Sequence, residues 1–263
     1  MWGGKISEKI VPYHVTLYYS SFWVANDDRY FCGGTIINEY FILTAGHCAN
    51  DTRKENYRLY IGSRERFGGN LTTIKRIILH EGYKLLDDEV RAVNDIALVE
   101  LEYPLYFYNE YQHLNYPVPL FDKYEETPVN TISKMVGWGM INSTTYPKVL
   151  HSIELPIVSK DDCNKTYISS YGGIMEKQIC AGFIDDNDDG MKSMADGDSG
   201  SALIVNGRLA GVASWVSEPI GQPKSPGVFT EVAQYRDWID EKVRHCKKCT
   251  PFSEIAAKYP YKN

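Results

Sequence analysis

The sequence predicts an all-β protein, built either as a sandwich or as a pair of barrels. Short runs rich in β-branched and aromatic residues recur between turn signals along the chain. The runs do not alternate with long helical patterns, which argues against a parallel sheet with crossover helices. The length of 263 residues suits one large β domain or two barrels of about 120 residues each. The 43% hydrophobic composition supplies a sizeable core.

Six runs carry the β pattern, and a connection separates them into two halves. In chain order they are HVTLYYS (14–20), YFILTA (40–45), YRLYIG (57–62), DIALVEL (95–101), SIELPIV (152–158) and LAGVASW (209–215). The Pro- and Tyr-rich segment 103–119 reads as a long connection between the halves. We therefore expect a first barrel over 1–118, with strand contributions that cross over, and a second over 119–245. Residues 246–263 form a loosely attached extension.

Two helices are expected, both in the second half. The first follows Ser159 as N-cap, with Asp162 at the third helical position, which is close to a capping box. The second covers residues 234–245 and has an apolar stripe at helical spacing. The stripe consists of Tyr235, Trp238, Ile239 and Val243. We interpret it as core packing and not as a groove for a partner.

Charge and composition narrow the classes of partner and the compartment. The net charge is −6 and no basic run exceeds Lys247–Lys248, so nucleic acid and anionic membranes are disfavoured. No stretch approaches the ~18 apolar residues of a membrane helix. No leader pattern follows Met1, as in a cytosolic protein or in a secreted chain whose leader has been removed.

Cysteines and glycosylation signals favour secretion. Cys32 and Cys48 flank one short loop, and Cys163 and Cys180 flank another. Pairings this local would each stabilise the fold by roughly 3 kcal/mol. Four Asn-x-Ser/Thr sequons suggest a glycoprotein. The sequons begin at Asn50, Asn70, Asn142 and Asn164.

Three short motifs carry the chemistry: LTAGHC (43–48), NDIALV (94–99) and GDSGS (197–201). Each is weak alone, because a histidine beside a cysteine is more often packing or metal ligation and an aspartate opening a strand is usually a cap. Together they run His, Asp, Ser, whereas α/β-hydrolases run Ser, Asp, His and subtilisins Asp, His, Ser. A serine hydroxyl needs a base near neutrality to take its proton during attack.

With these motifs the sequence resembles the trypsin/chymotrypsin family of serine peptidases, from MWGG to about His245. The resemblance also includes FCGGTI (31–36), VGWG (136–139), ICAGF (179–183), SWV (214–216) and PGVFTEV (226–232). Two further segments resemble the mite digestive peptidases of allergen group 3; they are NEYFILTAGHC (38–48) and LHEGY (79–83). The family implies two six-stranded antiparallel β-barrels with a C-terminal helix and a catalytic triad in the cleft between the barrels.

The resemblance assigns the catalytic roles. Ser199 would attack the scissile carbonyl, His47 would take its proton and pass it to the leaving amine, and Asp95 would orient the imidazole. Backbone N–H groups of Gly197 and Ser199 would form the oxyanion hole. Losing one such donor costs on the order of 10²–10³ in rate.

The resemblance also places the substrate. Ser214, Trp215 and Val216 would pair with an extended substrate backbone as an added strand. Ser193 falls at the base of the specificity pocket, where a basic P1 side chain would need a carboxylate. Val216 narrows the pocket mouth and Gly227 keeps the opposite wall open. We therefore expect an apolar P1 residue, medium-sized or aromatic.

The amino terminus departs from the family pattern. In the family, a free Ile-Val-Gly-Gly terminus pairs its ammonium with the aspartate before the nucleophile, which implies an ion pair of Met1 with Asp198 here. Trp2 stands where the family has a much smaller valine, and so demands rearrangement. If the chain continues upstream, the protein is a zymogen cleaved before Met1. If it does not, a buried Asp198 lacks its cation, which is costly.

Two departures flank the nucleophile. Ala195 replaces the cysteine of a disulfide beside the pocket, which would leave the pocket wall more mobile. Ser201 replaces a glycine, and a positive φ there would cost roughly 1 kcal/mol. These features, with Val216 and the unusual terminus, favour an alternative: a catalytically silent or weak homologue that binds other proteins.

No metal and no cofactor are expected. The acidic stretch 185–196 matches a calcium-binding loop but has no flanking helices. HCKKC (245–249) is an incomplete zinc site, so Cys246 and Cys249 are expected to form a local disulfide or to pair with another chain. The expected partners are protein or peptide substrates and protein inhibitors, and the chain is expected to be a monomer.

Overall fold

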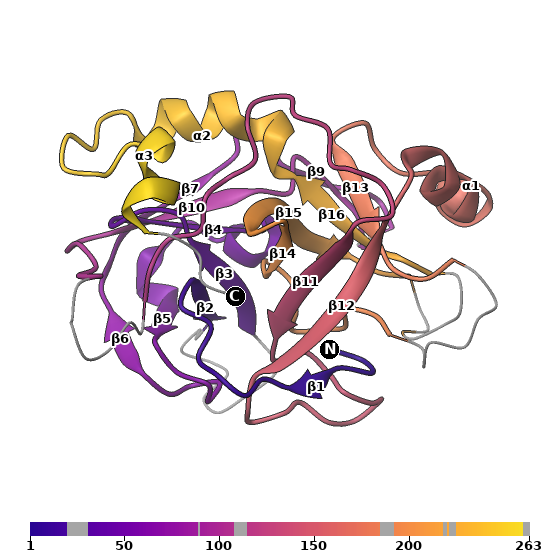
Figure 1. The fold of residues 1–263 in the computed structure, drawn as a ribbon, viewed down its shortest axis with the longest axis horizontal. Coiled ribbons are helices and arrows are strands. Elements are labelled where there is room, and N and C mark those ends of the chain that lie inside the picture. The colour runs from indigo at the N-terminus through magenta and orange to yellow at the C-terminus, as the bar shows by residue number, and fades with distance from the viewer. Residues whose placement is uncertain are drawn as a thin grey trace.

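Two antiparallel sheets form the body of the computed structural model (Figure 1), which describes residues 1–19, 31–88, 90–107, 115–184, 192–217, 220 and 225–259. The first sheet contains β2 (His14–Tyr19), β3 (Phe31–Ile36), β4 (Phe41–Thr44), β5 (Tyr57–Ile61), β6 (Asn70–Thr72), β7 (Ile74–Leu79) and β10 (Ala97–Leu101). The second contains β1 (Lys5–Ile6), β11 (Ile132–Gly137), β12 (His151–Val158), β13 (Gln178–Ala181), β14 (Ala202–Val205), β15 (Arg208–Trp215) and β16 (Gly227–Glu231). A separate hairpin joins β8 (Lys84–Leu85) to β9 (Ala92–Val93). Each of the six predicted runs contains a strand.

The second sheet closes into a barrel of six strands. Its strand β12 pairs with β11 on one side and with β13 on the other, and this completes the ring. Strand β1, near the amino terminus, adds to the outside of β12 through Lys5 opposite Ser152. The start of the chain therefore lies against the second barrel.

The first sheet curves in the same way but stays open. Its order is β6-β5-β2-β3-β4-β10-β7, and β5 and β7 lie in contact without a ladder between them. Strand β6 occupies the outer edge of β5 from Leu59 to Ile61, so that edge cannot pair with β7. The all-β pair of barrels predicted from the sequence is thus present, with one barrel closed by pairing and one held by side-chain packing.

Helices follow the local signals closely. Helix α1 (Lys160–Tyr171) begins at Ser159, whose Oγ accepts a hydrogen bond from Asp162 N at 3.1 Å. It ends at Gly172, which adopts the left-handed φ of 71° common at helix C-termini. The remaining helical elements are η1 (His47–Ala49), η2 (Lys54–Asn56), η3 (Val232–Tyr235), α2 (Arg236–Val243) and α3 (Phe252–Lys258).

Helix α2 covers the first barrel, although it follows the last strand of the second. Its stripe packs into the hydrophobic cluster of the first sheet, where Ile239 is fully buried and Trp238 is nearly so. Figure 1 shows α2 and α3 along one side of the molecule, near β7 and β10. The stripe is core packing, as predicted, and it ties the two barrels together.

The prediction of a loosely attached C-terminal extension is wrong for its described part, up to residue 259. Ile255 of α3 is fully buried in this part. Glu39, in the first barrel, accepts hydrogen bonds from Thr250 N at 2.8 Å and from Tyr259 Oη at 3.1 Å. A buried apolar anchor and a half-buried acceptor offset the ordering entropy of the segment. None of the helices in the described ranges is long and apolar enough to cross a membrane.

Candidate active site

His47 opens the short helix η1, which is separated from the end of strand β4 by two residues. Its neighbour Cys48 forms a disulfide with Cys32 of β3, with a Cα–Cα distance of 6.1 Å. This cross-link holds the His47 loop against the sheet. The imidazole keeps 29% of its surface exposed, so a substrate can reach it.

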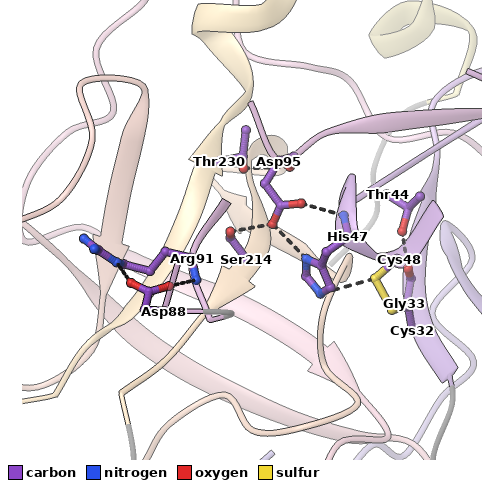
Figure 2. A network of polar contacts seen from close by, with 10 residues as sticks. All are labelled: Cys32, Gly33, Thr44, His47, Cys48, Asp88, Arg91, Asp95, Ser214 and Thr230. Atoms are coloured by element: carbon purple, nitrogen blue, oxygen red, sulfur yellow. Dashed lines mark hydrogen bonds and ion pairs between the residues drawn. A yellow bond between two sulfur atoms is a disulfide. The ribbon is translucent and has the colours of Figure 1, made fainter. Parts of the chain in front are cut away.

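Asp95 lies just before β10 and is 2% exposed. Its Oδ2 lies 2.8 Å from His47 Nδ1, and its Oδ1 accepts a hydrogen bond from His47 N at 2.8 Å. Ser214 Oγ donates to the same Oδ2 at 2.6 Å, and Thr230 Oγ1 donates to the Asp95 carbonyl at 2.8 Å. Figure 2 shows the carboxylate between the imidazole and the Ser214 hydroxyl. These four contacts hold the imidazole in one orientation.

The pKa values of Asp95 and His47 are set by two opposing effects, burial and the charges and hydrogen bonds of close partners. Burial disfavours ionisation of Asp95, but the His47 charge and the hydrogen bonds from His47 and Ser214 outweigh it and lower the Asp95 pKa. For His47, burial favours the neutral ring, but the Asp95 charge and hydrogen bond outweigh it and raise the His47 pKa. Asp95 therefore stays ionised and makes the imidazole a stronger base.

Asn94, to which sequence reasoning assigned no role, forms the turn that precedes Asp95 and fixes its position. Its φ is 50°, a left-handed conformation that asparagine tolerates better than most residues. Asn94 Oδ1 accepts a hydrogen bond from Tyr235 Oη at 3.0 Å, and Nδ2 donates to the Gly82 carbonyl at 2.8 Å. The available sequence signal was the asparagine itself, because asparagine is common where a turn needs a left-handed residue.

Ser199 sits in a tight loop packed against the strands that carry His47. The glycines on either side, Gly197 and Gly200, have φ values of 88° and 78°. Gly33 N, in β3, donates to the Ser199 carbonyl at 2.7 Å. A Cβ on Gly200 would lie 2.4 Å from the Gly33 carbonyl oxygen, so only glycine allows this approach.

The structure joins Asp95, His47 and Ser214 directly and brings Ser199 to the same strands. Gly33, which binds the Ser199 carbonyl, is the neighbour of Cys32, and Cys32 is bonded to Cys48 beside His47. Within the described part of the chain, the Ser199 hydroxyl makes no hydrogen bond. Catalytic hydrogen bonds are often long without substrate and tighten when it binds.

The strain expected at Ser201 does not arise. Among the described residues the positive φ values in this loop belong to Gly197 and Gly200, not to Ser201. Ser201 N donates to the Asp198 carbonyl at 3.1 Å, and its carbonyl accepts from Ala213 N at 3.0 Å. A serine therefore fits here without a backbone penalty.

Asp198 precedes Ser199 in this loop, and its side chain is buried. Its Oδ2 lies 2.6 Å from the amino group of Met1, and both side chains are fully buried. The ammonium also donates to the Met140 carbonyl at 2.9 Å. Gly139 N and Ala195 N donate to the carboxylate at 2.8 Å and 3.0 Å. A buried ion pair with all its hydrogen bonds made is strongly weakened by loss of either partner.

The Trp2 side chain is accommodated without a buried apolar pocket. Its side chain is partly exposed, while its backbone forms an antiparallel bridge with Ser193. Ser193 N donates to the Trp2 carbonyl at 3.1 Å. The large ring thus stays near the surface while Met1 packs into the core of the second barrel. The size difference from valine is accommodated at the surface.

Met194, a side chain that sequence reasoning missed, packs against the predicted pocket residue Gly227. A Cβ on Gly227 would lie 3.0 Å from Met194 Sδ, so the thioether packs directly on that glycine. Met194 is 4% exposed and belongs to the second-barrel core, against which Val216 also packs. Ser193 is 3% exposed beside it. The only sequence signal for Met194 was its place between Ser193 and Ala195.

Trp215 fixes the end of strand β15. Its indole lies 4.9 Å from the Tyr167 ring and 5.3 Å from the Tyr171 ring, both on α1. The ladder between β14 and β15 ends at Ala202 opposite Val212. Residues 214–216 lie beyond that ladder.

The cysteines form three local disulfides. Cys163–Cys180 and Cys246–Cys249 join the Cys32–Cys48 bond, which decides the open alternatives for the last pair. Within the described ranges, the one group of potential metal ligands is Cys32, His47 and Cys48, and both of its sulfurs are in a disulfide. Residues 185–191 of the calcium-loop-like stretch lie outside the described residues.

The family model described as Trypsin matches residues 2–239. The chain belongs to the trypsin family. It is 35% identical to Trypsin 5G1 of Aedes aegypti over 243 residues, which cover 91% of this chain and 83% of that protein. It is 34% identical to Trypsin zeta of Drosophila erecta over 251 residues (90% and 83%), and 31% identical to the thrombin-like enzyme agkihpin-1 of Gloydius halys over 219 residues (80% and 84%).

A solved trypsin-family structure shares the fold. Neuropsin, a serine protease expressed in the limbic system of mouse brain, superposes with a TM-score of 0.76 at 26% identity. The match covers 92% of this chain and all of that one. The trypsin-like fold predicted from the motifs is therefore confirmed, and the relatives are serine proteases. The finer similarity to mite peptidases stays a prediction.

Proposed function

We propose that this chain is a secreted serine endopeptidase that uses Ser199, His47 and Asp95 as its catalytic triad. The observation that carries the proposal is the buried Asp95 carboxylate, which binds His47 Nδ1 at 2.8 Å while Ser214 Oγ completes its shell. Membership of the trypsin family supplies the reaction class. Protein or peptide chains are the substrates, and protein inhibitors are further partners of the same cleft in a monomeric enzyme.

In the proposed reaction, the Ser199 oxygen attacks the scissile carbonyl carbon while His47 Nε2 takes the hydroxyl proton. The oxyanion that forms is bound by the backbone N–H groups of Gly197 and Ser199. His47 then gives its proton to the leaving amine, and water hydrolyses the acyl-enzyme by the reverse sequence. Because His47 must be neutral to act as base, activity rises with pH through its raised pKa.

The buried Met1–Asp198 pair is proposed as the activation contact, formed once the amino group is free. Its geometry supports the role, because Asp198 lies between Gly197 and Ser199, the two residues whose amides form the oxyanion hole. Any extension before Met1 would replace the ammonium by an amide that cannot pair with the carboxylate. Such a form would be the zymogen.

The proposed specificity is for apolar P1 residues, and the packing of Met194 favours medium-sized ones. The Met194 thioether lies next to Gly227, and Val216 packs against the same core, so a pocket between these residues would be apolar and shortened. Ser193 offers no charge for a basic P1 group. A panel of peptide substrates that differ only at P1 tests this, and fastest cleavage after Arg or Lys would overturn it.

Secretion and glycosylation belong to the same proposal. Asn50, Asn70 and Asn142 are exposed and open to a glycan. Asn164 is only partly exposed, which leaves less room for a glycan. We expect the first three sequons, and not Asn164, to carry glycans in protein secreted from eukaryotic cells. Site mapping after enzymatic deglycosylation checks this, and a glycan on Asn164 would contradict it.

A fluorophosphonate probe separates the enzyme from its alternative, a silent homologue that binds other proteins. Such probes phosphonylate a serine only where a base and an oxyanion hole activate it. We expect labelling of the chain with a free Met1 amino group, abolished by Ser199→Ala and kept in Ser170→Ala, an exposed position on α1. No labelling of the processed protein would defeat the peptidase proposal and favour the binding module.

A further inference from the structure

A short loop of the first barrel, residues 63–69, reaches across to the second barrel beside the proposed active site. An antiparallel bridge joins it to the segment 148–150. Leu150 N donates to the Arg64 carbonyl at 2.7 Å, and Arg66 N donates to the Lys148 carbonyl at 3.0 Å. The backbone of this loop is therefore clipped onto the other barrel on both sides of the bridge.

The Arg66 side chain is buried where the barrels meet, with 7% of the residue exposed. Its Cζ lies 4.8 Å from the ring centroids of both Phe31 and Phe67, and 5.8 Å from that of Tyr146. Thr16 Oγ1 donates to the Arg66 carbonyl at 2.7 Å and fixes the backbone below it. A planar guanidinium among aromatic rings is held more strongly when water is excluded, as it is here.

Two of these rings touch the loop of the nucleophile. A Cβ on Gly197 would lie 2.7 Å from Phe31 Cζ and 3.2 Å from Tyr146 Cε1, so both rings pack against this glycine. The rings meet edge to face, with centroids 5.5 Å apart. Phe31 belongs to β3 of the first barrel and Tyr146 to the second. Gly197 is thus clamped by one ring from each barrel, and the Arg66 guanidinium lies over both.

We propose that Arg66 is a positioning residue for the oxyanion hole. By holding Phe31 and Tyr146 together it sets the position of the Gly197 peptide, whose N–H is one of the two proposed donors. This inference rests on the proposed peptidase function. Displacing this donor by a fraction of an ångström weakens its bond to the developing oxyanion more than its bond to the neutral substrate carbonyl. The transition state therefore loses more stabilisation than the ground state.

A role in stability alone would have a different signature. Loss of a purely structural contact lowers the melting temperature and leaves the turnover of the folded enzyme unchanged. Loss of a positioning contact lowers kcat while KM stays close to its original value. The affinity for a peptide aldehyde, whose adduct with Ser199 places an oxyanion in the hole, should fall together with kcat.

The test compares Arg66→Met and Arg66→Lys with a matched control, Arg208→Met. Arg208 also stacks on a ring, with Cζ 4.2 Å from the Phe121 centroid, but in a part of the second barrel that does not touch Gly197. For Arg66→Met we expect kcat and aldehyde affinity to fall about tenfold, with KM changed less than about twofold. Arg66→Lys should recover part of the loss because it keeps the charge but not the plane. Arg208→Met should keep the original kcat.

Unchanged kcat and aldehyde affinity in folded Arg66→Met would overturn the inference, and so would an equal loss in Arg208→Met. If Arg66→Met does not fold, Phe31→Leu removes the ring edge from Gly197 while keeping an apolar side chain. Its kcat should then fall with KM preserved, and an unchanged kcat would refute the clamp. Failure of the original chain to react with a fluorophosphonate would instead count against the peptidase proposal itself.

Discussion

His14 should make the fold sensitive to acid. It is the first residue of β2, 3% exposed, with its ring stacked 4.9 Å from that of Trp138. Burial lowers the His14 pKa from the usual 6.5 to about 3. The unfolded chain therefore takes up a proton near pH 6.5, whereas the folded chain resists it until about pH 3. Stability is complete above the unfolded value and is lost as the pH falls through this window.

The size of the effect follows from the His14 pKa difference. Each pH unit within the window removes about 1.4 kcal/mol from the free energy of unfolding. Between pH 7 and pH 5 the loss should be about 2 kcal/mol, and by pH 3 it should reach about 4 kcal/mol. These losses are a large share of the total stability of an ordinary domain.

The assay is urea unfolding at pH 7, 6, 5 and 4, carried out in a Ser199→Ala background to prevent self-digestion. His14→Gln cannot take up the proton, so its stability should fall less steeply with acid than that of the parent chain. The two curves should diverge by about 2 kcal/mol between pH 7 and pH 5. His245→Gln, at an exposed position, is the control and should follow the parent chain. Parallel curves for His14→Gln and the parent would refute the reasoning.

Three further outcomes are expected. Ser214→Ala removes a hydrogen bond of 2.6 Å from the Asp95 carboxylate, and kcat/KM measured on a peptide substrate should fall about tenfold. Asp198→Asn leaves the Met1 ammonium buried without its counter-charge; urea unfolding should show a loss of about 3–5 kcal/mol, and turnover should fall about 100-fold or more. Glu39→Gln weakens the docking of α3, and thermal unfolding should show a loss of about 1–2 kcal/mol without a change in kcat.

Each outcome can be contradicted. Full activity in Ser214→Ala would mean that His47 alone keeps Asp95 in place. Retained stability in Asp198→Asn would mean that the Met1 amino group is satisfied by the Met140 carbonyl alone. A fall in kcat for Glu39→Gln, with no change in unfolding, would place the C-terminal segment in the working of the cleft and not in the stability of the barrel.

Much of the local structure could be predicted because it depends on short-range signals. The β runs alternate or cluster apolar residues within six or seven positions, and Ser159 with Asp162 caps α1 through a contact three residues apart. Helix α3 escaped prediction for the opposite reason. It has only seven residues, and it is held by Glu39, more than 200 positions earlier in the chain. Such an anchor leaves no trace in a local pattern.

Some residues of the candidate site could be predicted from short motifs, and others could not. The order His, Asp, Ser in short motifs pointed to His47, Asp95 and Ser199, because each of these proposed catalytic residues lies in a short motif of its own. No short sequence motif pointed to Met194 or Arg66. Their surroundings are built from segments distant in sequence, such as Gly227 for Met194 and Phe31 for Arg66.

The sequence by itself determined the fold class and the family and singled out the proposed catalytic residues, since these inferences depend on periodicity and on motifs in a certain order. Only the tertiary structure decided how those groups are supported: Asn94 behind Asp95, the Gly139 and Ala195 amides on the Asp198 carboxylate, and the ring clamp at Gly197. The physical reason is that burial, desolvation and close packing belong to the surroundings of a residue, and the surroundings of this site come from both barrels at once.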